Sequence, residues 1–198
     1  MFVQVIEGHV GDGDGLRAQL DRWVEELGPT ADGWLGTTSG IAGDGTFVAL
    51  ARFESEAAAQ ANSARPEQGE WWDGTAACFD GDVTFTNCPD VDGFGTTGAG
   101  AGFVQLVYGR ADRDALLAMV DEITALLARV RPDVIGNLMA WPGDGTFVQA
   151  VYFTNEADAR KGEQAEPAPE DAARFADLVA RMEPTRFVDL TDPWIVEA

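Results

Sequence analysis

The sequence has very few of the residues that most often build catalytic or metal sites. His9 is the only histidine, so a Ser-His-Asp triad, a Cys-His pair or a histidine metal site repeated in both halves is excluded. Cys78 and Cys88 are the only cysteines, they lack a CxxC spacing, and two reduced thiols are the expected state. No glycine fingerprint for phosphates follows a strand pattern. We therefore expect no metal, haem, flavin or other cofactor.

Basic residues are also scarce. The chain has 13 Lys and Arg against 34 Asp and Glu, which gives a formal net charge of -21. Nucleic acids and anionic membrane surfaces both attract clustered Lys and Arg, so neither is an expected partner. No segment approaches the roughly 18 apolar residues of a membrane span, and no basic leader precedes the first apolar segment. A cytoplasmic location is the expected default.

What the sequence does contain is a duplicated pattern. The segment 43–48, Gly-Asp-Gly-Thr-Phe-Val, recurs as residues 143–148 within a longer correspondence between the two halves. A repeat of this size is typical of duplicated structural units. Each half has strand and helix patterns in the order β-α-β-β-α-β. The predicted organisation is a first repeat over residues 1–88, a glycine-rich linker over 89–102 and a second repeat over 103–198.

Apolar periodicity and turn residues place the individual elements. In the first half, strands are expected at 2–6, 34–41, 46–53 and 83–87, with helices at 16–27, 54–64 and 71–79. In the second half, strands are expected from 103, at 134–141, 146–153 and 186–190, with helices at 116–127, 155–164 and 170–182.

This order of elements predicts the fold class. A β-α-β-β-α-β unit forms one antiparallel sheet with both helices on a single face. The other face is apolar here, since Val48, Leu50, Val104 and Leu106 lie on strands, and exposing it would cost about 25 cal/mol per Å². The second copy can cover the first. We expect an α+β chain of two ferredoxin-like repeats packed sheet to sheet as a pseudo-dimer that encloses an interior.

One stretch in each half resembles a known family. Residues 44–57 contain a glycine hairpin, an apolar strand ending in Phe and a Ser-Glu-Ala helix start, and residues 144–157 repeat this order with Thr-Asn-Glu-Ala. This pattern resembles the third strand and following helix of the antibiotic biosynthesis monooxygenase family, in the dimeric α/β-barrel superfamily. The resemblance covers both halves. It implies a site for an aromatic or polyketide-like substrate that reacts with oxygen without a cofactor.

The sequence departs from that family at the positions that carry its chemistry. Members that oxidise phenols carry an Asn and a Trp four residues apart on the third strand and a Tyr on the helix beyond. The matching positions hold Ala49, Phe53 and Ala59 in the first half, and Gln149, Phe153 and Ala159 in the second. Only Gln149 keeps an amide that can stabilise an oxyanion. The haem-degrading branch has a haem-binding His on the second helix, which both halves lack, so haem degradation is disfavoured.

The candidate ligand-binding residues are amides and tryptophans in otherwise apolar elements. Consecutive tryptophans cannot both face one core, so Trp71 and Trp72 either cap one end of the first repeat or divide between core and pocket. Gln4 and Gln105 occupy equivalent strand positions, where a buried amide needs a backbone or ligand partner. The second half adds Asn137, Trp141 and Gln149. Strand alternation places Tyr152 opposite Gln149, so these two cannot line one pocket wall.

Two functions remain open at this point. One is a small-molecule-binding protein with at most one working cavity, which as an enzyme would be a cofactor-independent monooxygenase. The other is a non-catalytic binding or structural protein with a degenerate site. A cavity of roughly 300 Å³ or more that holds convergent polar groups would favour a ligand. The Gly-Asp-Gly turns lack the spaced oxygen ligands of a calcium loop, so hairpin geometry explains them.

Overall fold

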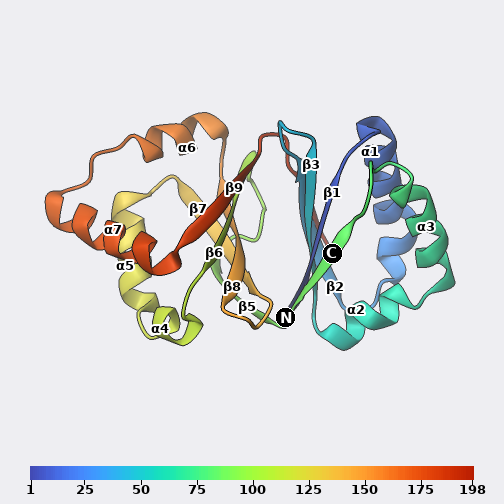
Figure 1. Cartoon of the computed structure of the whole chain (residues 1–198), viewed down its shortest axis with the longest axis horizontal. Helices are drawn as coiled ribbons and strands as arrows, with labels where there is room; N and C mark the ends of the chain where they lie inside the picture. The colour runs from blue at the N-terminus through green and yellow to red at the C-terminus, as the bar shows by residue number, and fades with distance from the viewer. The chain divides into compact units, whose positions relative to one another are not determined.

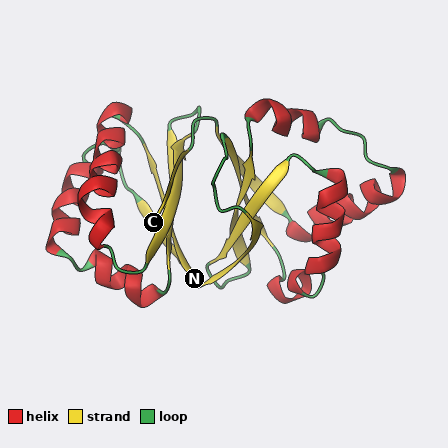
Figure 2. Ribbon diagram, turned by 180° about the vertical axis from the view of Figure 1, so that it is seen from behind, coloured by secondary structure: helices red, strands yellow, loops and turns green.

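A computed structural model describes all of residues 1–198 as two compact units (Figure 1). Unit 1 consists of residues 1–91 and 192–198, and unit 2 consists of residues 92–191. Each unit has one five-stranded sheet with its helices on a single face (Figure 2). The predicted α+β class and the two-repeat organisation are confirmed. Packing of one sheet against the other stays a prediction. No helix is both long and apolar enough to cross a lipid bilayer.

The sheet of unit 1 has the strand order β10-β2-β3-β1-β4. Its strands are β1 (Phe2–His9), β2 (Trp34–Ile41), β3 (Thr46–Phe53), β4 (Thr84–Cys88) and β10 (Trp194–Glu197). Its helices are α1 (Gly13–Arg22), extended by a π-helical turn (Trp23–Leu27) and a 3-10 turn (Gly28–Thr30), then α2 (Glu56–Ser63) and α3 (Pro66–Ala76). The four strands of the repeat have the ferredoxin-like order, and β10 is added beside β2.

Unit 2 repeats this arrangement with the strand order β5-β7-β8-β6-β9. Its strands are β5 (Asp90–Gly95), β6 (Phe103–Arg110), β7 (Val134–Trp141), β8 (Thr146–Phe153) and β9 (Pro184–Leu190). Its helices are α4 (Arg113–Leu117), α5 (Val120–Val130), α6 (Glu156–Glu163) and α7 (Pro169–Met182). Here β5 is added beside β7, the counterpart of β2.

The two added strands differ from the organisation expected from the sequence. Strand β5 lies within residues 89–102, where glycine content predicts a linker, and it forms the edge of the unit 2 sheet. Its glycines permit close approach to β7, because a Cβ on Gly93 would lie 2.4 Å from the carbonyl oxygen of Asn137. Strand β10 follows the second repeat but pairs with β2, from Trp194 opposite Ser39 to Glu197 opposite Gly36. Each repeat is thus followed by a strand that completes the sheet of the other.

The two Gly-Asp-Gly hairpins have the same internal geometry. The carboxylate of Asp44 accepts a hydrogen bond from the backbone N–H of Thr46 at 2.9 Å, and Asp144 accepts one from Thr146 at 2.9 Å. Hydrogen bonds from these threonines lower the pKa of both carboxyls. The largest cause is the bond from the backbone N–H of Thr46 for Asp44 and the bond from the hydroxyl of Thr146 for Asp144. Each carboxylate therefore stabilises the fold at pH values above the ordinary carboxyl pKa of 3.8. This contribution is lost as the pH falls through the lowered pKa.

The third residue of each hairpin has a backbone that only glycine adopts easily. Gly145 has a φ of 81°, and no heavy atom lies closer than 3.7 Å to a Cβ built on it. We expect Gly145→Ala to lower the free energy of unfolding by about 1–2 kcal/mol through backbone strain alone. Gly69→Ala is the matched control, since Gly69 lies in α3 with nothing near its Cβ position, and should stabilise by about 1 kcal/mol. Urea denaturation measures both, and equal shifts would contradict the strain argument.

Candidate ligand-binding pockets

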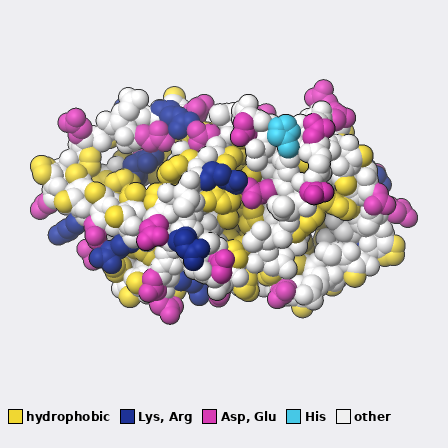
Figure 3. Space-filling model, in the orientation of Figure 1, with side chains coloured by type: hydrophobic (Ala, Val, Ile, Leu, Met, Phe, Trp, Pro, Cys, Tyr) yellow, Lys and Arg dark blue, Asp and Glu magenta, His cyan; other side chains and the backbone are white.

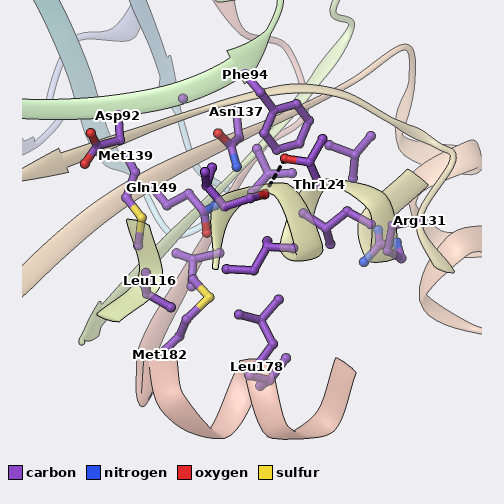
Figure 4. Close-up of a pocket in the computed structure, with 18 of the residues that line it drawn as sticks. Asp92, Phe94, Leu116, Thr124, Arg131, Asn137, Met139, Gln149, Leu178 and Met182 are labelled. Carbon is purple, nitrogen blue, oxygen red and sulfur yellow. Dashed lines mark hydrogen bonds between the residues drawn. The ribbon is translucent and has the colours of Figure 1, made fainter. Parts of the chain in front are cut away.

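Each unit has a cavity between its sheet and its helices. The cavity of unit 1 is about 340 Å³, and that of unit 2 (Figure 4) is about 260 Å³, which is below the roughly 300 Å³ expected of a ligand site. The sequence predicts an interior enclosed by two facing sheets, whereas both of these cavities lie on the helix-covered face within a unit. In unit 1 the small side chains Thr37, Ser39, Ala49 and Ala51 line the sheet side, which leaves room beneath the helices. Each unit therefore has a cavity, and the expectation that at most one of them works stays a prediction.

All seven residues predicted from the sequence line one of these cavities. Gln4, Trp71 and Trp72 lie in unit 1, and Gln105, Asn137, Trp141 and Gln149 lie in unit 2. Tyr152 is buried and does not line the cavity that Gln149 lines, as strand alternation predicts. That the seven residues contact a ligand stays a prediction.

Three amides surround Val151 on the floor of the unit 2 cavity. Gln105 pairs with Val151 across β6 and β8, and Asn137 pairs with it across β7 and β8. Gln149 lies two residues earlier on β8 and shares this face. Directly opposite Cβ atoms lie about 5 Å apart and diagonal ones about 7–8 Å apart, so one small molecule can reach more than one amide. Figure 4 shows Asn137 and Gln149 pointing into the cavity.

The three amides differ in how far the protein already uses them. Gln105 Nε2 donates to Asp189 at 3.0 Å and to Glu163 at 3.4 Å, within an ion network that Arg160 completes. The side chains of Asn137 and Gln149 have no hydrogen-bond partner in the structure, although both are partly buried. A half-buried amide without a partner gains by binding a carbonyl or hydroxyl group. Asn137 and Gln149 are therefore the groups available to a ligand.

One wall of the unit 2 cavity is held by a polar network. Trp141 Nε1 donates to Asp92 Oδ2 at 2.9 Å, and Arg113 Nε donates to the same oxygen at 2.7 Å. Arg113 Nη2 also donates to Asp92 Oδ1 at 3.0 Å. Asp92 belongs to β5, the strand that lies within the segment predicted as a glycine-rich linker. This strand therefore holds both the indole of Trp141 and, through Arg113, helix α4. Sequence reasoning selects Trp141 but misses Asp92 and Arg113, because nothing in the local pattern brings them together.

The rest of the unit 2 cavity is apolar and open at an apolar rim. Leu117, Val120, Val179 and Phe187 line it although they are 38–57% exposed, which places them among the most exposed large apolar side chains of the chain. The cations that line it, Arg113 and Arg131, are paired with Asp92 and Asp133. The arrangement suits a neutral, largely apolar molecule with one or two oxygen functions.

The cavity of unit 1 has a different character, because five of the six tryptophans of the chain line it: Trp23, Trp34, Trp71, Trp72 and Trp194. Trp71 is 7% exposed and its Nε1 donates to the carbonyl oxygen of Gln19 at 2.7 Å, whereas Trp72 is half-buried. Trp71 is thus buried and the adjacent Trp72 is only partly buried, although both line the cavity. Gln4 Nε2 donates to Asn87 at 3.1 Å.

Sequence reasoning misses the other three tryptophans for separate reasons. Trp23 belongs to the apolar stripe of the first helix, which predicts only core packing. Trp34 begins β2, and Trp194 follows the last expected strand. An unusual count of tryptophans was the available signal, but only the fold gathers them into one cavity.

Comparison with solved structures shows the same fold in other proteins. A candidate monooxygenase from Fusobacterium nucleatum superposes with a TM-score of 0.71 at 7% identity, over 99% of this chain and 94% of that one. A candidate monooxygenase from Lactobacillus acidophilus gives 0.64 at 10% identity over 99% of each chain, and an anthrone oxidase-like protein gives 0.61 at 10% identity over 98% and 93%. No protein-family model matches the sequence, and no curated protein matches it. The likeness to solved structures shows the antibiotic biosynthesis monooxygenase-like fold, which the hairpin pattern predicts.

Proposed function

We propose that unit 2 binds a neutral aromatic or polyketide-like molecule and oxidises it with molecular oxygen without a cofactor. The observation that carries the proposal is the pair of unpartnered amides, Asn137 and Gln149, on the floor of an otherwise apolar cavity. The two halves diverge at both positions. The likeness to solved structures supports the fold, and one of those structures is described as anthrone oxidase-like. A cytoplasmic location without nucleic acid or membrane partners stays a prediction.

The proposed chemistry depends on a substrate that becomes electron-rich when it ionises. An anthrone-type phenol loses a proton to the solvent, and its anion reduces molecular oxygen. The CH2 group becomes a carbonyl that keeps one oxygen atom, and the other oxygen leaves as water with the two hydrogens of the CH2 group. The N–H groups of Gln149 and Asn137 donate to the phenolate oxygen, in the manner of an oxyanion hole.

The cavity supplies no free base for this proton. Asp92 is its only carboxylate, and Arg113 and Trp141 already hold both of its oxygens. We therefore expect oxygen uptake to rise with pH as the phenol itself ionises and to level off above the pKa of the phenol. An oxygen electrode measures this profile for phenols of different acidity. A midpoint that stays constant across such phenols would contradict the substrate-ionisation mechanism.

Substitution of Gln149 tests the role of the amide. We expect Gln149→Leu to lower the rate of oxygen uptake by about 100-fold, since a single oxyanion donor is worth that much in other enzymes. Gln149→Asn keeps an N–H donor and should retain most of the rate. Both variants should keep the wild-type thermal midpoint, which separates a lost donor from a lost fold. Equal rates for the Leu and Asn variants would overturn the assignment.

The alternative is a non-catalytic binding or structural protein. It is favoured by the alanines that stand where phenol-oxidising relatives have a tyrosine, Ala59 and Ala159, both buried. A panel of planar phenols, titrated by tryptophan fluorescence and then tested for oxygen uptake, discriminates between the functions. Binding without oxygen uptake would leave a binding protein. No binding to any member would leave the structural role.

A further inference from the structure

The cavity of unit 1 is built as an aromatic cage. The rings of Trp23 and Trp34 lie 4.8 Å apart at 72°, and those of Trp23 and Trp71 lie 6.3 Å apart at 62°. In each pair the edge of one ring meets the face of the other, and the three rings form a core cluster that also lines the cavity. Trp72 and Trp194 line the same cavity of about 340 Å³. Nothing comparable lines the cavity of unit 2, which has a single tryptophan.

The indole N–H groups of this cage are mostly committed to the protein. Trp23 Nε1 donates to Gln68 at 2.7 Å, Trp34 Nε1 donates to Thr37 at 3.1 Å, and Trp71 Nε1 donates to the Gln19 carbonyl. These donors are therefore not available to a hydrogen-bonding ligand. What the tryptophans offer instead is the negative potential of their ring faces, which attracts cations.

A cation already occupies one of these ring faces. The guanidinium carbon of Arg17 lies 4.8 Å from the centroid of the Trp194 ring, and both residues line the cavity. Arg17 is half-exposed and is paired with Asp21, which also lines the cavity. This pair places a cation against one of the indoles that line the cavity, next to a carboxylate.

The charge of unit 1 favours a cation as well. Its residues include 18 Asp and Glu against 4 Arg, whereas unit 2 has 16 Asp and Glu against 9 Lys and Arg. Acidic side chains are spread over the face seen in Figure 3. Two carboxylates, Asp21 and Asp192, lie at the cavity itself. Arg17 also lines the cavity and pairs with Asp21, so Asp192 and the acidic surface of unit 1 supply the net negative charge that attracts cations.

We propose that unit 1 binds a hydrophobic organic cation, a quaternary or protonated tertiary amine that carries an aromatic or alkyl group. The tryptophan cage supplies apolar contact and cation–π attraction, and the two carboxylates supply the counter-charge. This site is separate from the cavity in unit 2, so it does not depend on the oxidation proposed there. The two repeats thereby bind ligands of different chemistry.

A pair of isosteric probes tests the charge preference. Phenyltrimethylammonium and tert-butylbenzene have the same shape and differ in charge. Tryptophan fluorescence of the Trp141→Phe variant reports on unit 1 alone, because its five remaining tryptophans all line this cavity. We expect the cation to bind at least about fivefold more tightly than its neutral counterpart. Equal or tighter binding of tert-butylbenzene, or no binding of the cation, would overturn the proposal.

Arginine substitutions test whether the cage itself provides the preference. Arg17→Gln frees the Trp194 face and Asp21, so it should tighten phenyltrimethylammonium binding by about threefold or more. Arg22→Gln is the matched control, since Arg22 lies on the same helix, pairs with Glu26 and does not line the cavity. It removes the same charge and should change affinity less than about twofold. Equal effects of the two variants, or an equal gain for tert-butylbenzene with Arg17→Gln, would refute a cation cage.

Discussion

Truncation of the chain after Thr191 is expected to lower the free energy of unfolding of unit 1 by more than about 3 kcal/mol. The truncation removes β10, whose four residues pair with β2, and the Trp194 carbonyl that accepts a hydrogen bond from Ser39 at 3.2 Å. It also removes Glu197, whose carboxylate lies 2.9 Å from Arg52 Nη2.

Arg52 makes this loss large because its charge is buried. Its side chain is 3% exposed, while that of Glu197 is 43% exposed. The pair is a close ion contact and not an aligned hydrogen bond, and Arg52 Nε has no hydrogen-bond partner. A buried cation that loses its counter-charge is costly, whereas replacing both partners by apolar groups is often neutral. Glu197→Gln should therefore destabilise by about 1–2 kcal/mol, and Arg52→Met in the same chain should recover most of that loss.

Urea unfolding followed by tryptophan fluorescence measures these changes, since most tryptophans lie in unit 1. Gly145→Ala is the control for unit 2. It should shift the unfolding transition of unit 2, and the truncation should leave that transition unchanged. Wild-type stability of Glu197→Gln would show that the ion pair contributes nothing, and wild-type stability of the truncated chain would show that β10 is dispensable.

The main elements could be predicted because each has a local signal. Strands β3 and β8 have the expected bounds, since Gly-containing turns and helix-capping residues delimit an apolar run. Strands β5 and β10 have no such signal. They are short, they alternate poorly, and their partners β7 and β2 lie far away in the sequence. The glycines of β5 indicate flexibility when read locally, but in the fold they permit close contact between backbones.

The candidate sites divide in the same way. Amides such as Asn137 and Gln149 are visible in the sequence, because a polar residue in an apolar strand needs an explanation. The link from Asp92 to Arg113 and Trp141, and the assembly of the tryptophan cage, depend on contacts between distant segments. The sequence pattern therefore identifies individual polar or aromatic side chains. It does not identify the hydrogen-bond partners that decide whether each side chain is available to a ligand.

Trp71 and Trp72 are expected to respond very differently to replacement by alanine. Trp71 is 7% exposed, packs against Trp23 and donates to the Gln19 carbonyl, so Trp71→Ala should cost about 3–5 kcal/mol of unfolding free energy. Trp72 is half-buried, and its ring meets that of Phe85 at 5.0 Å. Phe85 is itself 48% exposed, so this contact lies near the surface. Trp72→Ala should cost only about 1–2 kcal/mol.

Binding should show the reverse order, because Trp72 lines the cavity and is only partly buried where it packs against the core. We expect Trp72→Ala to keep a cooperative unfolding transition and to weaken phenyltrimethylammonium binding by about tenfold, while Trp72→Phe keeps a ring and weakens it by about threefold. Trp71→Phe is the matched control for the core: it should remain folded with a smaller stability loss than Trp71→Ala. Equal stability losses for the two alanine variants would show that Trp72 packs in the core as Trp71 does, and unchanged phenyltrimethylammonium binding by Trp72→Ala would show that its ring does not contact the ligand.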